Sequence, residues 1–456
     1  MQLQTIILAA GQGTRMRSAT PKVLHKIGGT PLLEHVYRLA RQLGGQEINV
    51  VYGHGGEQVL SALSDLQVRW TEQTERLGTG HAVMQVADRI SDANKVLILY
   101  GDVPLLRLKT VQKLIQHVGP QSLGLLTIRL DNPSGYGRIV RDSQGKVVRI
   151  VEEKDASNEQ RAIGEVNTGI LAVPGAKLKE WLGRLNNDNA QGEYYLTDII
   201  ALAVEDGFYV DTTQPDEESE VLGINNRAQL AQLERLYQLR HAEDLMDKGV
   251  TLRDPARFDL RGDIEALGQD VEIDVNVVLQ GRIRLGNRVK IGPNVLISDS
   301  EIGDGVEILA NSVIENAQIG AGGRIGPFAR IRPESVLAED VHIGNFVEIK
   351  KTTVGQGSKI NHLSYVGDAR VGAGVNIGAG TITCNYDGAN KHLTVIEDGA
   401  FIGSDTQLVA PVTVGRNATL GAGTTLTKDA PADTLTLSRA KQASISGWQR
   451  PVKKRT

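Results

Sequence analysis

The chain has 456 residues, more than one ordinary hydrophobic core accommodates, so two or three domains are expected. Its formal net charge of −4 lacks the strong basic excess of nucleic-acid-binding proteins, and no apolar run is long enough for a membrane-spanning helix. We therefore predict neither a nucleic-acid partner nor a membrane partner.

The cysteine content and the first residues indicate the compartment. The single cysteine, Cys384, cannot form an internal disulfide, which fits a reducing environment. Residues 1–10 carry no basic segment and lead directly into a strand-like pattern, so no signal peptide is expected. The sequence thus predicts a cytoplasmic protein.

In the first half, short apolar runs that end in glycine alternate with helix-like stretches. The apolar runs cover residues 5–10 and 96–100, and the helix-like stretches cover 32–43 and 81–90. This alternation is typical of an open, Rossmann-like α/β domain with a mostly parallel sheet. Ligands bind at the carboxyl ends of the strands in such sheets, so both strand ends are candidate walls of a site.

The first of these strand ends has the features of a phosphate-binding loop. Residues 8–16 have the sequence LAAGQGTRM. Its two glycines let the backbone approach a phosphate, and the N–H groups of such a loop form an anion-binding nest. Arg15 and Lys22 can add positive charge over a triphosphate. The motif is neither a P-loop nor a GxGxxG fingerprint, and a strand-to-helix turn with surface cations remains an alternative explanation.

Two carboxylates stand out in the first half. Asp102 follows the wholly apolar run 96–100. A carboxylate there is suited to bind Mg²⁺, which also binds substrate phosphates, although a helix cap or turn residue is the alternative. Glu152 lies in the charged run EEKD, which from the residues alone is explained nearly as well by a solvated turn.

A helix is predicted between the two halves of the chain. Asn225 and Asn226 can cap its start, and Gly249 stands at the stop position. We predict three segments on this basis, namely a first domain over 1–227, a linker helix over 228–250 and a second domain over 251–456.

The second half has a short, strict period. A six-residue spacing of aliphatic residues fits neither an amphipathic helix nor a simple strand, but it is typical of a parallel β-helix in which each unit makes one flat side. The aliphatic side chain points inward and glycine takes the corner. The longest runs are Ile319, Ile325, Ile331, Leu337, Ile343, Ile349 and Ile396, Ile402, Leu408, Val414, Leu420, Leu426.

The repeat is interrupted at two places. His362 breaks the aliphatic and small-residue rhythm within the sequence KINHLSY, and His342 and His392 compete with it as candidate functional histidines. The period also pauses between Ile382 and Ile396, and loops that leave a β-helix commonly carry binding residues.

The motifs of the first half resemble those of the sugar-phosphate nucleotidyltransferases, whose opening motif is close to LxxGxGTRM…PK. Together with a left-handed parallel β-helix of hexapeptide repeats, the whole chain resembles the bacterial bifunctional N-acetylglucosamine-1-phosphate uridylyltransferases and glucosamine-1-phosphate acetyltransferases. One departure is Gln12, where that family often has lysine. The further matching motifs are Gln73, Leu77-Gly78-Thr79-Gly80, Tyr100-Gly101-Asp102, Gly135-Tyr136-Gly137-Arg138, Glu152, Asn167-Thr168-Gly169 and Asn225.

The resemblance implies two successive reactions. Acetyl-CoA acetylates the amine of glucosamine 1-phosphate, and UTP then gives its uridylyl group to N-acetylglucosamine 1-phosphate. The products are UDP-N-acetylglucosamine, a precursor of peptidoglycan and lipopolysaccharide, and pyrophosphate. Mg²⁺ is the implied cofactor. The implied assembly is a homotrimer in which the insertion at 384–393 completes a neighbour's acetyl site.

The resemblance also assigns residues to the uridylyl site. Gln73 with Gly78 and Thr79 would hold uracil, and Asp102 with Asn225 would hold Mg²⁺. Because the sugar phosphate is already anionic, this step needs positioning and charge neutralisation rather than a base. The full predicted set is Leu8, Ala9, Ala10, Gly11, Arg15, Lys22, Gln73, Gly78, Thr79, Tyr100, Gly101, Asp102, Gly137, Glu152, Asn167 and Asn225, of which Gly137, Glu152 and Asn167 would contact the sugar.

Acetyl transfer, by contrast, requires the amine to lose a proton. A histidine is the natural base, and the resemblance assigns this role to His362. Arg332 and Lys350 would bind the sugar phosphate, although each taken singly is explained equally well as a solvated residue. The remaining residues assigned to glucosamine phosphate or acetyl-CoA are Tyr365, Asn376, Ala379, Asn385, Tyr386, Ser404, Ala422 and Arg439. The basic tail over 450–455 is either a solvated end or a contact for the coenzyme A phosphates.

Two other functions compete with this interpretation. One is a nucleotidyltransferase whose β-helix is only structural or regulatory, which leaves His362 and the insertion without a reason. The other is an oligomerisation module with a degenerate first domain, which the intact loop motif and Asp102 oppose. Acetyl-CoA consumption distinguishes the first alternative, and UTP turnover distinguishes the second.

Overall fold

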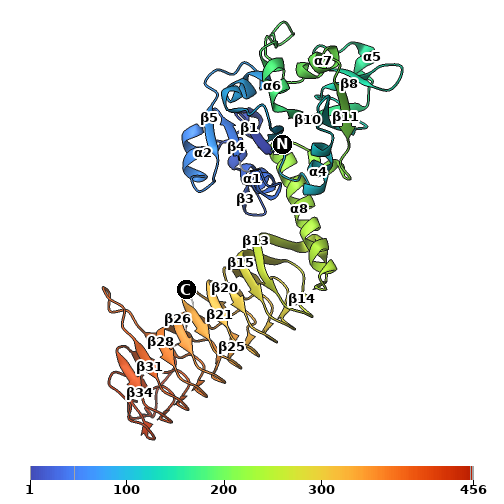
Figure 1. Cartoon of the computed structure of the whole chain (residues 1–456). Helices are drawn as coiled ribbons and strands as arrows, with labels where there is room; N and C mark the ends of the chain where they lie inside the picture. Colours follow the sequence, from blue (N-terminus) through green and yellow to red (C-terminus); the bar gives the residue numbers. More distant parts are fainter. Residues whose placement is uncertain (1, 46, 452, 454–456) are drawn as a thin grey trace. The chain divides into compact units, whose positions relative to one another are not determined.

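The computed structural model describes residues 2–45, 47–451 and 453. The chain folds into two compact units, Met1–Tyr237 and Gln238–Thr456 (Figure 1). Their boundary falls within helix α8 (Arg227–Asp247), which covers most of the segment predicted as a linker. The predicted domain limits at 227 and 250 stay predictions.

The first unit is built on a nine-stranded sheet whose main path has the order β11-β7-β10-β6-β1-β4-β5. Most neighbours on this path are parallel, and β10 is antiparallel to both of its partners. A β8–β9 hairpin joins β10 off the path. The strands are β1 Leu3–Ala9, β4 Glu47–Tyr52, β5 Arg69–Glu72, β6 Lys95–Tyr100, β7 Ser122–Arg129, β8 Arg138–Arg141, β9 Val147–Val151, β10 Glu165–Pro174 and β11 Tyr209–Thr213.

Helices cover both faces of this sheet and explain why its central strands are apolar throughout. Alternate side chains of β1 and β6 enter two separate cores, one containing Ile7 and Leu99 and the other containing Ile6 and Ile98. The first core is covered by α1 (Leu32–Gln42), α2 (Gly56–Ala62) and α4 (Leu108–Gln116). The second is covered by α3 (Thr79–Met84), α6 (Gly175–Leu182) and α7 (Asp198–Glu205), while α5 (Asn158–Arg161) is a single turn.

The helix predicted over 81–90 differs from the one in the structure. Helix α3 begins at Thr79 and ends at Met84, and a short 3₁₀ turn follows at Ala87–Arg89. The break lies at Val86, whose φ of −118° is outside the helical range. Val86 and Ile90 are both buried in the core beneath the sheet, so packing overrides the local helical pattern here.

The second unit is the predicted left-handed β-helix, and the six-residue period corresponds to its three sides. One sheet stacks Ile291, Ile308, Ile325, Ile343 and Ile360 directly above one another, all buried. Each coil therefore takes 17 or 18 residues here, which is three hexapeptides or one residue fewer. The strands of this side are β12 Thr251–Leu252, β14 Glu272–Ile273, β16 Lys290–Ile291, β19 Glu307–Ile308, β22 Arg324–Ile325, β25 His342–Asn345, β27 Lys359–His362, β29 Asn376–Ile377, β32 Phe401–Ile402, β35 Thr419–Leu420 and β37 Leu435–Thr436.

The other two sides form a second, fifteen-stranded sheet. Its inward ladders include Ile302, Ile319 and Leu337 on one side and Ile314 and Ile331 on the other. Its strands are β13 Phe258–Leu267, β15 Val277–Leu285, β17 Leu296–Ser298, β18 Glu301–Ile302, β20 Val313–Glu315, β21 Ala317–Ile319, β23 Arg330–Ile331, β24 Ser335–Leu337, β26 Glu348–Val354, β28 Tyr365–Val371, β30 Ile382–Cys384, β31 Thr394–Ile396, β33 Gln407–Val409, β34 Val412–Val414 and β36 Thr425–Leu426.

Among the residues that the structure describes, no helix is long and apolar enough to cross a membrane.

Candidate functional sites

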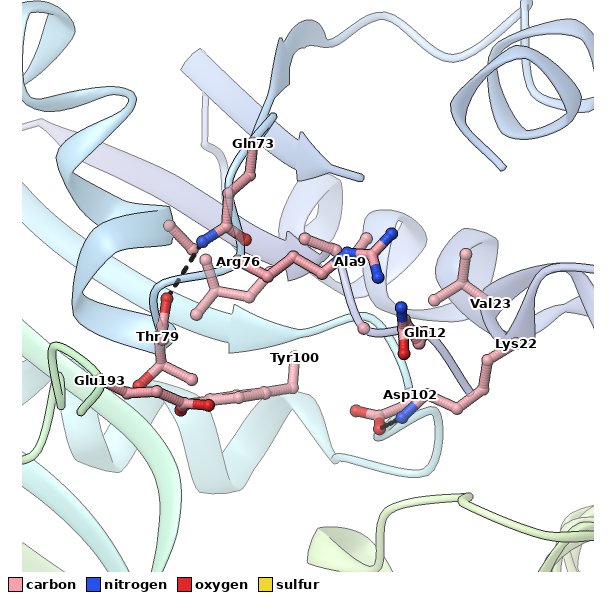
Figure 2. A pocket seen from close by; sticks show the side chains of 15 residues that line it. Ala9, Gln12, Lys22, Val23, Gln73, Arg76, Thr79, Tyr100, Asp102 and Glu193 are labelled. Carbon is pink, nitrogen blue, oxygen red and sulfur yellow. Dashed lines mark hydrogen bonds and ion pairs between the residues drawn. The ribbon is translucent and has the colours of Figure 1, made fainter. Parts of the chain in front are cut away.

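A cavity of about 320 Å³ lies at the carboxyl ends of β1 and β6. These strands pair in parallel with Leu8 opposite Tyr100, and the Gly101 N–H donates to the Leu8 carbonyl at 2.9 Å. The register therefore brings the predicted phosphate loop beside Asp102 (Figure 2). The predicted residues that line the cavity are Leu8, Ala9, Ala10, Gly11, Lys22, Gln73, Gly78, Thr79, Tyr100 and Asp102.

Glycine is required where the phosphate loop folds over Lys22. Gly13 has a φ of 61°, and a Cβ at this position would lie 2.7 Å from the Lys22 Cβ. Because that distance is shorter than any normal contact, a larger residue would displace either the loop or the lysine. The absence of a side chain at Gly13 thus leaves room for Lys22 at the edge of the cavity.

The Lys22 ammonium brings together two oxygens from distant parts of the first unit. It contacts Asp102 Oδ2 and lies 3.2 Å from Asn225 Oδ1. Carboxylate and amide oxygens are hard donors of the kind that Mg²⁺ takes together with substrate phosphates and waters. The described residues contain no cluster of three or more His, Cys, Asp or Glu side chains suited to a metal. Asp102 and Asn225 supply two oxygen donors that fit Mg²⁺, which commonly takes its other ligands from substrate phosphates and waters.

The predicted uracil-binding residues lie at the other end of the cavity. Gln73 is buried, and its Nε2 donates to the Gly78 carbonyl at 3.1 Å. The Gly80 N–H donates to the Tyr194 carbonyl at 2.8 Å, and Thr79 Oγ1 accepts from the Leu196 N–H at 3.2 Å. The segment 77–80 is therefore fixed by the segment 194–196, which no local sequence pattern revealed.

The three predicted sugar-binding residues are neighbours. The Asn167 N–H donates to the Gly137 carbonyl at 2.8 Å, and a Cβ on Gly137 would lie 3.3 Å from Glu152 Oε1. Thr197 Oγ1 donates to Glu152 Oε1 at 2.9 Å. Burial raises the pKa of Glu152, and burial together with the charge of Glu152 raises the pKa of Asp198 to about 6. Thr197 and Asp198 were not predicted from the sequence.

Tyr100 lies between the nucleotide end and the sugar end. Burial raises the pKa of its phenol strongly, and the nearby carboxylates of Glu152 and Asp102 raise it further. A Cβ on Gly169, whose φ is 84°, would lie 2.5 Å from the Tyr100 ring. Tyr100 therefore stays protonated and tightly packed against the backbone.

Six predicted residues do not line this cavity, namely Arg15, Gly101, Gly137, Glu152, Asn167 and Asn225. Arg15 lies in a 3₁₀ turn (Thr14–Met16), is exposed and does not line the cavity. Its role in triphosphate binding stays a prediction. Five residues that line the cavity were not predicted as site residues. One of them, Gln12, was noted from the sequence only as a departure from the family motif. The five residues are Gln12, Val23, Arg76, Ala82 and Glu193.

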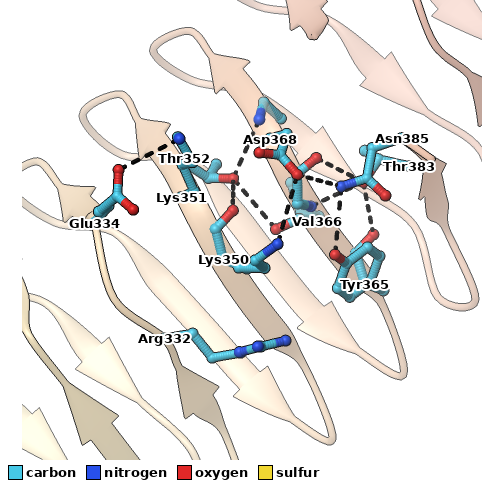
Figure 3. Close-up of polar contacts among 12 residues, drawn as sticks. Arg332, Glu334, Lys350, Lys351, Thr352, Tyr365, Val366, Asp368, Thr383 and Asn385 are labelled. Atoms are coloured by element: carbon cyan, nitrogen blue, oxygen red, sulfur yellow. Dashed lines mark hydrogen bonds and ion pairs between the residues drawn. The ribbon is translucent and has the colours of Figure 1, made fainter. Parts of the chain in front are cut away.

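In the second unit, a network of polar side chains crosses successive coils (Figure 3). Arg332 donates to Glu348 Oε1 at 2.7 Å, and the Lys350 Nζ lies 3.8 Å from Asp368 Oδ2. Asn385 Nδ2 donates to the same Asp368 oxygen at 2.5 Å and lies 3.4 Å from the Tyr365 hydroxyl. Asp368, which was not predicted, therefore contacts both Lys350 and Asn385, and Asn385 in turn contacts Tyr365.

His362 belongs to a second group on the β-helix. It is exposed at the end of β27, and its Nδ1 lies 3.2 Å from Asn345 Oδ1. His362 lies two positions after the inward-pointing Ile360 of its coil. The strand register pairs Ile360 with an inward residue on each neighbouring coil, and the residue two positions after each of these occupies the same column as His362. The residues in this column are Asn345, His362, Ala379, Ser404 and Ala422, four of which were predicted for the acetyl site.

The other predicted acetyl-site residues are spread around this column. Asn376 is half-buried on β29, and the Arg439 guanidinium would come within 3.6 Å of a Cβ on Gly421. Tyr386 is exposed in the insertion, where its hydroxyl donates to the Gly388 carbonyl at 2.6 Å. Lys454 and Arg455 of the basic tail lie outside the described residues.

The competing residues are less well placed for proton or acyl transfer. His392 is engaged by Asp387 at 2.7 Å within the insertion, and His342 is half-buried on β25. Burial raises the pKa of the Cys384 thiol, which lowers its thiolate fraction and disfavours a role as acyl carrier.

Comparisons with known proteins cover the whole chain. A model of the MobA-like NTP transferase domain matches residues 5–248, a GMPPB C-terminal domain matches 265–355, and six bacterial transferase hexapeptide repeats match 393–428. The bifunctional protein GlmU of Methylococcus capsulatus is 68% identical over 100% of this chain and 99% of its own. The GlmU proteins of Azoarcus and Stutzerimonas stutzeri are each 59% identical, over 99% and 100% of this chain and 100% of their own lengths.

The chain belongs to the GlmU family of bifunctional transferases.

Family membership agrees with the resemblance stated from the motifs and with the predicted fold of both halves. Membership of a family of bifunctional proteins over the full length also weighs against a solely structural β-helix and against a degenerate first domain.

Proposed function

We propose that this GlmU-family chain acetylates glucosamine 1-phosphate with acetyl-CoA and then transfers the uridylyl group of UTP to the product. The observation that supports the proposal is twofold. Ten of the sixteen residues predicted for the uridylyl site, Asp102 among them, line one cavity, and the residues predicted for the acetyl site lie on successive coils of the β-helix that carries His362. We place the enzyme in the cytoplasm, where both co-substrates are made and used.

In the uridylyl step, a phosphate oxygen of the sugar bonds to the α-phosphorus of UTP, and the bond to the β-phosphate oxygen breaks so that pyrophosphate leaves. Gln73, Gly78 and Thr79 would hold the base, and Glu152, Asn167 and Gly137 would hold the sugar. Lys22 lies where the phosphates would enter. Mg²⁺ held by Asp102 and Asn225 would supply further positive charge for the triphosphate.

In the acetyl step, the amine nitrogen bonds to the thioester carbonyl carbon and the carbon–sulfur bond breaks, releasing coenzyme A. His362 would accept the proton that the amine gives up, a contribution of about 10²–10⁴ in rate. The contact between His362 Nδ1 and Asn345 leaves Nε2 to face the substrate. Lys350 and Arg332 would bind the sugar phosphate, and Tyr386, Ser404, Ala422 and Arg439 would contact acetyl-CoA or the amino sugar.

Removing divalent metal is expected to separate the two activities. With EDTA, uridylyl transfer should stop because the triphosphate charge is no longer neutralised, whereas acetyl transfer should continue because thioester chemistry develops no comparable charge. Pyrophosphate release and coenzyme A release, measured in the same preparation, report the two steps. Loss of both activities in a protein that remains folded would refute this division.

We also propose a homotrimer in which the insertion at 384–393 completes a neighbour's acetyl site. The β-helix exposes large apolar side chains at one corner of successive coils, including Phe328 and Phe346, whose rings stack at 5.3 Å, and Leu363. Closed three-fold packing would bury such a surface without open-ended association. Light scattering should give three times the chain mass, and a fully active monomer would disprove the trimer.

The direct test of the function is the formation of UDP-N-acetylglucosamine from glucosamine 1-phosphate, acetyl-CoA, UTP and Mg²⁺. Production of the nucleotide sugar from N-acetylglucosamine 1-phosphate alone, without acetyl-CoA consumption from glucosamine 1-phosphate, would favour a structural β-helix instead.

A further inference from the structure

Two cationic side chains line the cavity of the first unit, and they differ in their partners. The ammonium of Lys22 is already engaged by Asp102 and Asn225. Arg76 is exposed, and it forms no hydrogen bond or ion pair with the part of the chain that the structure describes. Arg76 is therefore the cavity-lining cation whose charge is left for a ligand.

The side chain of Arg76 extends over the phosphate loop. Figure 2 shows it reaching toward Ala9 and Gln12. Arg76 follows the base-binding Gln73 by three residues, and it also lines an adjoining groove of about 510 Å³ with Gly53 and His54. Arg76 thus borders both the cavity that contains Lys22 and Asp102 and the groove beside it.

The neutral residue at position 12 explains why a positive charge from elsewhere in the chain is needed over the phosphate loop. Gln12 is neutral, so the loop between Gly11 and Gly13 offers its backbone N–H groups but no cation of its own. Arg15, the next cation of the loop, does not line the cavity. A triphosphate carries several negative charges, and Lys22 shares its single charge with Asp102.

We propose that Arg76 binds the β- and γ-phosphates of UTP, and pyrophosphate in the reverse reaction, and so supplies the positive charge that Gln12 does not. The planar guanidinium suits this role because its paired donors match two phosphate oxygens at once. The inference rests on the proposed uridylyl transfer and names a residue for the leaving half of its nucleotide substrate.

Arg76→Gln is expected to raise KM for UTP and for pyrophosphate about tenfold, as for the loss of a charge-assisted hydrogen bond. KM for N-acetylglucosamine 1-phosphate should stay within about twofold, because that substrate binds near Glu152. Arg76→Lys should lose less than Arg76→Gln. The matched control is Arg69→Gln, which removes an exposed arginine whose partner is Glu47 at 3.7 Å and which does not line the cavity; its kinetics should equal those of the wild type.

A double variant that moves the positive charge from position 76 to position 12 tests the inference more stringently. In the Arg76→Gln background, Gln12→Lys places a cation back over the loop and should recover most of the lost affinity for UTP and pyrophosphate. Three outcomes would each overturn the inference. The KM for UTP and pyrophosphate could stay unchanged in Arg76→Gln, or the KM for the sugar phosphate could rise as much as theirs. Lysine at position 12 could also fail to restore the affinity. A wild-type enzyme without UTP turnover would instead refute the proposed function. Thermal unfolding of each variant confirms that the first unit is intact.

Discussion

Replacing His362 by alanine is expected to lower acetyl transfer to glucosamine 1-phosphate by about 10²-fold or more. His362 is exposed in the column of predicted acetyl-site residues, and its ring hydrogen-bonds Asn345, so its removal deletes a base without disturbing the core. Uridylyl transfer from UTP to N-acetylglucosamine 1-phosphate should stay near the wild-type rate, because its predicted residues belong to the other unit. Coenzyme A release and pyrophosphate release measure the two rates.

The matched control for this variant is His342→Ala. His342 precedes the inward Ile343 one coil away and is not in the His362 column, so both activities should persist. A His362→Ala protein that remains folded and trimeric but has lost both reactions would contradict the assignment. Undiminished acetyl transfer would contradict it equally.

Asp102→Asn is expected to give the reverse pattern, with uridylyl transfer lowered on the order of 10²-fold and acetyl transfer unchanged. The amide keeps the size of the side chain but removes the negative charge that holds Lys22 in this structure and would hold Mg²⁺. The Mg²⁺ concentration that gives half-maximal uridylyl transfer should rise as well. Both quantities follow from pyrophosphate release in a magnesium titration.

Asp92→Asn serves as the control for Asp102→Asn. Asp92 is an exposed carboxylate of the same unit that pairs with Lys179 and does not line the cavity. Its uridylyl rate and magnesium requirement should match those of the wild type. Equal magnesium requirements for Asp102→Asn and the wild type would show that Asp102 does not take part in metal binding.

The β-helix was predictable from the sequence because its structure is a local repeat. In the regular coils each inward residue stacks on its equivalent 17 or 18 positions away, and the spacing widens to 25 only across the insertion, so aliphatic spacing alone reveals the coils. The same logic extends to the site, since Asn345, His362 and Ala379 recur at 17-residue intervals in one column. This spacing is a signal in the sequence from which the column can be found.

The cavity of the first unit was only partly predictable. Residues that directly follow β1 and β6 were found because strand ends are marked by apolar runs and glycine. Glu193 and Asp198 were missed because their places depend on how the segment after α6 folds against 77–80 and Glu152, which is a tertiary contact. Arg76 was missed because a lone arginine in a polar turn resembles any solvated cation.

The most direct test of two independent sites mixes the two inactive variants. His362→Ala and Asp102→Asn are each expected to fail to convert glucosamine 1-phosphate into UDP-N-acetylglucosamine at a useful rate. Combined in one vessel with acetyl-CoA, UTP and Mg²⁺, they should restore the full route, because Asp102→Asn releases N-acetylglucosamine 1-phosphate and His362→Ala consumes it. The account predicts nucleotide sugar formation after a lag that shortens as the Asp102→Asn concentration rises, and a mixture of folded proteins that forms none would contradict it.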